Sequence, residues 1–321
     1  METRGSAVNG PERGYYGLPV LKPPVWRWEI WSYFFLGGLS AGTFLVASLA
    51  RLFGDEDDRR ASQVGYLLSF AAILPCPLLL IKDLGRPSRF LNMLRIVKPS
   101  SPMSMGIWGL IAFSVCSVLS AWRALGTVIG HPLPLSRALP ERLLALVGSA
   151  AALFIGGYTG VLLSVTSVPL WSRSVLLGPT FLAAAFSSGL AALGLALALC
   201  RGVPNRTLAK LRPMEVAALA VEGAMLAGFA RQSDRAVRPV VSSDEHGRGF
   251  LLGAVGVGII LPLLAHLVGP HHRRSAALSS VCALVGGVLL RRVLIEGGRA
   301  SAEDPQVTFW HTDRPPEKSQ W

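Results

Sequence analysis

The sequence has few of the residues that hold redox metals. It contains four cysteines, each alone inside an apolar run: Cys76, Cys116, Cys200 and Cys282. A zinc site or an iron–sulfur cluster needs several thiolates at close spacing, so neither can be built from this pattern. We interpret the cysteines as packing residues and predict that the chain holds no metal.

Histidine is also scarce, which bears on haem. Of six histidines only His266 falls within an apolar run, and the others lie in connections or the tail: His131, His246, His271, His272 and His311. A membrane cytochrome with two histidine ligands per haem is therefore not expected. A Walker loop and a dinucleotide fingerprint after a strand are absent as well, which excludes the usual ATP and NAD sites.

The fraction of charged residues is low. Charged residues make up 16% of the 321 residues, 51% are hydrophobic, and the mean hydropathy is +0.47. These values lie outside the soluble norm and predict an all-α, polytopic integral membrane protein. The net charge is +12, but Lys and Arg gather in short connections between apolar runs, as membrane anchoring requires. The expected partner of this charge is the lipid bilayer, and no nucleic acid is expected.

Eight apolar runs approach the roughly 20 residues that a helix needs to cross a bilayer. They cover residues 30–53, 61–81, 104–125, 141–166, 174–200, 213–230, 249–268 and 275–296. The first run is too long for a signal peptide and no cleavage site follows it, so we expect the chain to insert through its own first helix. The predicted organisation is an interfacial segment (1–29), an eight-helix membrane domain (30–296) and a polar tail (297–321), with both termini on one side.

Small residues indicate how the helices pack. Three spans carry glycines four residues apart: Gly38 and Gly42, Gly156 and Gly160, Gly249 and Gly253. This spacing puts both glycines on one helix face, where two backbones can approach closely. The string FLGGLSAG in the first span resembles FLAAAFSSG in the fifth, which favours two four-helix bundles.

Polar side chains at membrane depth are costly and are therefore functional candidates. Glu29 begins the first span and shares a helix face with Tyr33, four residues on. Asp83 ends the second span, and Tyr158 lies in the second half of the fourth. Up-and-down threading places Glu29, Asp83 and Tyr158 on the N-terminal side. For Asp83, a helix-ending turn with a local ion pair is the alternative to a ligand.

Cations accompany Asp83 in LLIKDLGRPSRFLNMLRIVKPSSP: Lys82, Arg86, Arg89, Arg95 and Lys98. One interpretation is that these side chains snorkel to the lipid headgroups. Another is that they attract an anionic partner. Arg86 or Arg89 would also hold Asp83 ionised.

Four blocks together resemble the NrfD family, the membrane subunit of polysulfide-reductase-type complexes, over residues 15–306: EIWSYFFLGGLSAGTFLVA, LPCPLLLIKDLGRPSRFLNMLRIVKPSSPMSMGIW, GYTGVLLSVTSVPLW and LLRRVLIEGGRASAEDPQ. The resemblance implies an eight-helix subunit of the bacterial cytoplasmic membrane without haem or iron–sulfur cluster of its own. It implies a quinone, menaquinone or ubiquinone, as exchangeable substrate. It also implies electron exchange with a docked iron–sulfur subunit, which serves a molybdopterin or multihaem catalytic subunit.

The resemblance also implies site residues. Tyr158 matches the quinone-site tyrosine in the family's fourth helix, and Glu29 and Tyr33 match polar residues at the start of the first helix by position, not identity. Asp83 and Arg86 belong to the motif after the second helix, which flanks the same pocket. Asp83 and Tyr158 are predicted to be catalytic, Asp83 by relaying protons and Tyr158 by bonding a quinone oxygen.

The partner and the membrane orientation are predicted separately. We expect Arg89, Arg95 and Lys98 to dock the iron–sulfur subunit. Lys and Arg are more numerous on the N-terminal side, which favours a cytoplasmic N-terminus, whereas the resemblance implies that this side faces outward. The orientation stays open.

Two further interpretations concern transport. Glu215 and Glu222 are seven residues apart in the sixth span and roughly share a face, so they form either a proton path or a polar bundle interior. A secondary transporter or ion-translocating protein is the alternative function. Such a protein would show broken helices at matched positions of its two halves, but the break at Pro75 and Pro77 has only Pro262 as a candidate counterpart.

Overall fold

The computed structural model describes residues 21–131, 133–134, 140–172, 174–200, 205–232, 248–268, 272–305 and 307–308. Most of the predicted interfacial segment (1–20), the end of the predicted tail (309–321), and His246, His271 and His311 lie outside the described residues. Within the described part of the chain all regular structure is helical.

The described residues form eight helices or helix pairs that are long and apolar enough to cross a membrane. They are α1 (Trp28–Phe53), α2 (Arg59–Ile73) with α3 (Cys76–Asp83), α5 (Pro102–Val128), α6 (Glu141–Ser164), α7 (Leu177–Leu199), α8 (Asn205–Gln232), the π-helical η3 (Gly249–Ile260) with α11 (Leu261–Val268), and α12 (Arg273–Glu303). The short elements are η2 (Glu56–Asp58) and α4 (Arg89–Arg95). The predicted polytopic all-α fold is confirmed.

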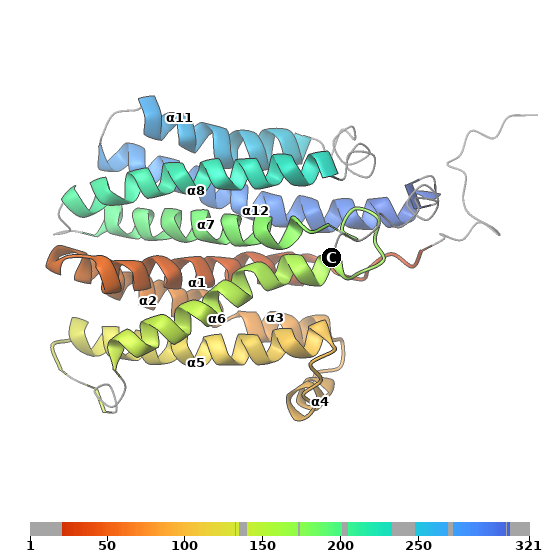
Figure 1. Cartoon of the computed structure of the whole chain (residues 1–321), viewed down its shortest axis with the longest axis horizontal. Helices are drawn as coiled ribbons and strands as arrows, with labels where there is room; N and C mark the ends of the chain where they lie inside the picture. The colour runs from red at the N-terminus through yellow and green to blue at the C-terminus, as the bar shows by residue number, and fades with distance from the viewer. Residues whose placement is uncertain are drawn as a thin grey trace, which may run out of the picture.

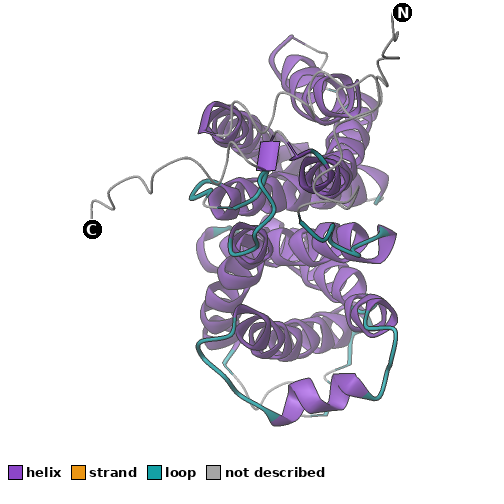
Figure 2. Ribbon diagram, turned by 90° about the vertical axis from the view of Figure 1, so that its right-hand side faces the viewer, coloured by secondary structure: helices purple, strands orange, loops and turns teal. Residues whose placement is uncertain are grey.

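The helices form two bundles, as predicted. The first contains α1, α2 with α3, α5 and α6, and the second contains α7, α8, η3 with α11, and α12 (Figure 1). Helices α1 and α6 pack against α7, and α1 also contacts α12, so the two bundles share one long seam. Figure 2 looks along the helices and shows one bundle above the other.

Glycines make this seam possible. A Cβ atom on Gly42 of α1 would lie 1.8 Å from the carbonyl oxygen of Ala185 of α7, and one on Gly189 would lie 2.2 Å from the backbone of Gly42. A Cβ on Gly160 of α6 would lie 2.3 Å from the carbonyl oxygen of Leu177. Because only glycine fits at such distances, the backbones touch directly, as the spacing of small residues predicts.

The second and seventh spans are interrupted. Pro75 stands between α2 and α3 and Pro77 lies in the first turn of α3, where their missing N–H groups and ring clashes interrupt the span. In the seventh span the π-helical η3 gives way to α11, with Pro262 in its first turn. The counterpart of the second span in the other bundle is α8, which runs unbroken from Asn205 to Gln232. The matched breaks that a transporter would show are therefore not seen in the described residues.

The two ends of the bundles differ. The end at which α1 begins and α3 and α12 finish also carries α4, and we call it the α4 end (right in Figure 1). The end at which α1 and α5 finish and α2 and α6 begin is called the far end. The first and last described residues, Leu21 and Thr308, both lie at the α4 end, as an even number of spans requires.

Candidate functional site

A small cavity lies inside the first bundle at the α4 end. Residues of α1, α3, α4, α5 and α6 line it, and they include three predicted site residues, Tyr33, Asp83 and Tyr158. The rest of the wall is largely apolar and includes Trp26 and Leu110. Three helices thus bring one carboxyl group and two phenols to one partly open, mostly apolar space.

Tyr158 is held firmly in this wall. Its side chain is buried, its ring stacks on Phe154 with centroids 5.4 Å apart, and its hydroxyl donates to the carbonyl oxygen of Pro102 at 2.6 Å. A Cβ on Gly106 would lie 2.1 Å from the Tyr158 ring, so α5 needs glycine there. The phenol hydrogen is used by the protein, whereas the phenol oxygen can still accept a hydrogen bond from a ligand.

Tyr33 and Asp83 have free hydrogen-bonding capacity. Tyr33 is buried, and among the described residues its hydroxyl has no hydrogen-bond partner. Asp83 is half-buried and makes no ion pair within the described part of the chain. The local ion pair that was the alternative interpretation of Asp83 is therefore not found there. Both groups can serve a molecule that enters the cavity.

Glu29 lies beside the cavity and does not line it. Its carboxylate is 3.4 Å from the Lys82 ammonium, which also lies over the Trp28 ring at 4.2 Å from the centroid. These contacts join the start of α1 to the last turn of α3. They hold two walls of the cavity together, because Tyr33 follows Glu29 by one helical turn and Asp83 follows Lys82 directly.

The remaining predicted cations are on the surface. Arg86, Arg89, Arg95 and Lys98 are exposed, and none of them lines the cavity. Helix α4 runs crosswise to the other helices at the outer edge of the first bundle, beside the beginning of α5 (Figures 1 and 2). Exposed apolar side chains accompany the cations: Leu91, Ile96 and Val97 are each at least 60% exposed. The segment therefore presents a surface that is both cationic and apolar, and Arg86 is placed on this surface and not at the cavity wall.

An apolar groove adjoins the cavity. It has a volume of about 350 Å³ and shares Leu80, Phe90, Ile107 and Leu110 with the cavity wall. It continues along α5, whose side chains at the outer edge are exposed where lipid would lie, for example Val115 at 52%. The cavity and the groove together can take a ligand with a polar head and a long apolar chain.

The two carboxylates of α8 have separate partners. Glu215 lies 2.7 Å from His266 Nε2 of α11, and this histidine also contacts the Ser279 hydroxyl of α12 at 3.0 Å. Glu222 accepts a hydrogen bond from Ser187 of α7. Both carboxylates are buried. They line the interior of the second bundle, which both interpretations of the pair require, and the proton path stays a prediction.

The sequence interpretation missed Arg291. Its side chain is 1% exposed, its guanidinium donates to the Gly287 carbonyl at 3.2 Å, and its central carbon lies 5.5 Å from the Phe181 ring centroid. The charge of Glu222 acts on it across the bundle interior. The signal was present in the sequence: two adjacent arginines in an apolar span cannot both reach the surface on one helix face. Its neighbour Arg292 makes a local ion pair with Glu296, at 2.9 Å.

Within the described residues, no group of three or more His, Cys, Asp and Glu side chains could hold a metal ion. The cysteines among them are unpaired: Cys76 and Cys116 are buried, whereas Cys200 is exposed and Cys282 partly so. That the chain carries no haem or iron–sulfur cluster stays a prediction.

Taken together, the eight spans and the polar groups at their ends define a multi-pass membrane protein with a small cavity at one end. The chain belongs to the NrfD family, since the model of the family described as polysulphide reductase, NrfD, matches residues 20–302. The predicted family is confirmed, and the match covers both bundles.

Individual relatives support the same assignment over most of the chain. The protein NrfD of Escherichia coli is 29% identical over 314 residues, which cover 86% of this chain and 95% of that protein. One of the polysulfide reductase chains of Wolinella succinogenes is 26% identical, and the match covers 86% of this chain and 94% of that one. One of the selenate reductase subunits of Mesobacillus selenatarsenatis is 23% identical, and the match covers 84% of this chain and 73% of that subunit.

Proposed function

We propose that this chain is the quinone- or quinol-binding membrane subunit of a multi-subunit oxidoreductase in the bacterial cytoplasmic membrane. It exchanges electrons between the membrane quinone pool and a docked iron–sulfur subunit. The observation that supports this proposal most strongly is the cavity that is lined by Tyr33, Asp83 and Tyr158 and adjoins an apolar groove. Two relatives, one from a polysulfide reductase and one from a selenate reductase, are named as parts of reductases, which supports the oxidoreductase class.

The residues of the cavity suit the two forms of the ligand. A quinone presents carbonyl oxygens, and the free Tyr33 hydroxyl can donate to one of them. A quinol presents hydroxyl groups, which can donate to the Asp83 carboxylate and to the oxygen of Tyr158 while that phenol keeps its bond to Pro102. Because the exchange of two electrons accompanies that of two protons, Asp83 at the helix end is the group placed to pass protons to or from water.

The groove suits the rest of such a molecule. Membrane quinones carry an isoprenoid chain, and the groove is lined almost entirely by apolar side chains of α3 and α5. The cavity is smaller than the groove, at about 100 Å³, and two of its wall residues are methionines, Met93 and Met103. Methionine side chains adapt easily to the shape of a neighbour, so a flat ring can enter without moving the helices.

We expect Tyr33→Phe to lower the affinity for quinone. The change removes one hydroxyl at nearly constant volume, and the loss of one hydrogen bond of about 1–3 kcal/mol corresponds to a roughly 5- to 150-fold weaker binding. The measurement is a titration of quinone against the purified chain in lipid nanodiscs. Thr43→Val is the matched control, because it removes a buried hydroxyl of the same helix that bonds only within α1. Wild-type affinity in Tyr33→Phe would argue against the site.

The partner surface follows from α4 and its flanks. We propose that Arg89, Arg95 and Lys98 dock the iron–sulfur subunit, which would deliver its electrons next to the cavity because Phe90 and Met93 of α4 also line that cavity. The exposed Leu91 and Ile96 give the same surface an apolar component. An interface that combines apolar contact with complementary charge favours fast and specific association.

Reversing Arg89, Arg95 and Lys98 to Glu is expected to release the partner from membranes while this chain stays inserted. The three changes replace attraction by repulsion on one surface. Co-purification of the complex at moderate salt measures the effect. The control reverses three exposed arginines at the far end, Arg142, Arg206 and Arg274, and should retain the partner. Equal retention in both triple variants would exclude docking at α4.

A further inference from the structure

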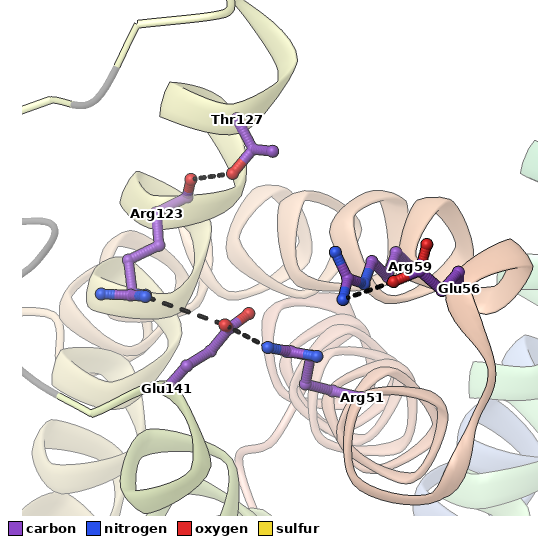
Figure 3. Close-up of polar contacts among 6 residues, drawn as sticks. All are labelled: Arg51, Glu56, Arg59, Arg123, Thr127 and Glu141. Atoms are coloured by element: carbon purple, nitrogen blue, oxygen red, sulfur yellow. Dashed lines mark hydrogen bonds and ion pairs between the residues drawn. The ribbon is translucent and has the colours of Figure 1, made fainter.

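A second polar pocket lies in the first bundle at the far end, away from the proposed quinone site. It has a volume of about 390 Å³ and is lined by the end of α1, the start of α2, the end of α5 and the start of α6. Three arginines, Arg51, Arg59 and Arg123, and one carboxylate, Glu141, are among its lining residues. Figure 3 shows Arg51 and Arg123 directed toward Glu141 from opposite sides. We call this space the arginine pocket.

The arginine pocket has an excess of positive charge. Arg51 lies 2.6 Å and Arg123 3.7 Å from the same Glu141 oxygen, so one carboxylate serves two guanidinium groups. Arg59 pairs with Glu56 at 3.0 Å, but that pair is largely exposed and is therefore weak. The first residues of α2 and α6, Arg59 and Glu141, also line the pocket. The N-terminus of α6, which carries partial positive charge, thus lies at this space, whereas α2 continues directly from the 3₁₀ turn η2.

Unused polar groups point to a missing partner. The Oγ atom of Ser120 is buried, its side chain is 4% exposed, and it has no hydrogen-bond partner within the described residues. The atom Nε of Arg51 is likewise buried and without a hydrogen-bond partner there, although the Arg51 side chain as a whole is 29% exposed. Burial of such groups without a partner is rare and costly in native proteins. Tyr66, Ser62 and Thr127 add three hydroxyl groups to the wall. The pocket therefore offers a set of donors around a positive centre.

We propose that the arginine pocket binds the phosphate group of an anionic ligand. Arginine forks, hydroxyl groups and helix N-termini are the donors that phosphate oxygens accept best. A volume of about 390 Å³ is enough for a phosphate with a small substituent and lies at the lower end of ordinary ligand pockets. The pocket lies where the membrane helices end, at the depth of lipid headgroups. Its ligand is thus an anionic lipid headgroup or free phosphate, which share this chemistry.

The test uses the full chain, purified and stripped of lipid. It is titrated with phosphatidylglycerol or phosphatidylcholine and followed by native mass spectrometry, and inorganic phosphate is tested against sulfate and chloride in a thermal-unfolding assay. We expect phosphatidylglycerol or inorganic phosphate to bind and raise the unfolding temperature. The double variant Arg59→Gln with Ser120→Ala should weaken this binding about tenfold, since each change removes one donor of a charge-assisted bond.

Controls separate the outcomes. Arg142→Gln removes an exposed arginine next to Glu141 that does not line the pocket, and it should bind like the wild type. Binding of phosphatidylglycerol without an effect of inorganic phosphate identifies a lipid headgroup, and competition by inorganic phosphate identifies free phosphate. Equal retention of phosphatidylglycerol and phosphatidylcholine without any effect of phosphate would overturn the proposal. So would equal binding in the double variant and the wild type.

Discussion

Replacing Asp83 by Asn is expected to lower quinone-linked electron transfer by about 100-fold or more, while quinone binding changes far less. A positioned acid or base typically contributes 10²- to 10⁴-fold to a rate, and the amide cannot carry a proton. The packing should survive, because Asn has the shape of Asp and no ion pair of Asp83 is lost within the described residues. Turnover is measured in membranes, with the amount of protein checked by blot.

Asp57→Asn is the matched control for this experiment. Asp57 is an exposed carboxylate at the far end, so its loss removes the same charge far from the cavity and should leave turnover unchanged. If Asp83→Asn keeps wild-type turnover, Asp83 does not relay protons. A parallel fall of both affinity and turnover would indicate a binding role alone.

Arg291→Met is expected to destabilise the second bundle strongly. The change removes a fully buried cation from the bundle interior that also contains the buried Glu222, whose hydrogen bond from Ser187 is kept, and loss of one of two opposite buried charges typically costs up to about 3–5 kcal/mol. The protein should reach lower levels in the membrane and unfold at a lower temperature in mild detergent. Size-exclusion profiles after heating give the measurement.

Two further variants test whether the buried charge accounts for this loss of stability. Arg292→Met changes the adjacent, half-exposed arginine, whose pair with Glu296 is a surface pair worth at most about 1 kcal/mol. It should therefore unfold close to the wild-type temperature. Adding Glu222→Gln to Arg291→Met removes the uncompensated charge and should restore part of the lost stability. If Arg291→Met and Arg292→Met unfold alike, the buried charge does not support the fold.

The sequence predicts the number of helices well, because an apolar run of about 20 residues is seldom found outside membrane-spanning helices. Helix ends are harder to predict. The sixth span was predicted over 213–230, but α8 begins at Asn205, since its first turns are polar and carry no membrane signal. The last span was predicted to end at 296, yet α12 continues to Glu303. This last part of α12 packs closely against Trp171, since a Cβ on Gly298 would lie 2.0 Å from that ring and only glycine fits there.

The site was predictable in part. Threading places Glu29, Asp83 and Tyr158 on one side of the membrane. The structure brings Asp83 and Tyr158 to one cavity together with Tyr33, whereas Glu29 lies beside it. What the sequence could not reveal are contacts between helices that are distant along the chain. The bond from Tyr158 to Pro102 and the pair of Glu215 with His266 depend on helix rotation, which no periodicity fixes. The arginine pocket was missed for the same reason, because its charges come from four segments.

Photo-crosslinking with an azido-quinone tests the central claim most directly, because it locates the ligand without relying on any variant. The full chain in lipid nanodiscs is labelled, digested and mapped by mass spectrometry, with and without excess unlabelled quinone. The account predicts label in two segments that contribute to the cavity wall, residues 80–84 at the end of α3 and residues 103–110 of α5. Excess unlabelled quinone should suppress this label. Competed label confined to the second bundle, or label that excess quinone does not suppress, would contradict it.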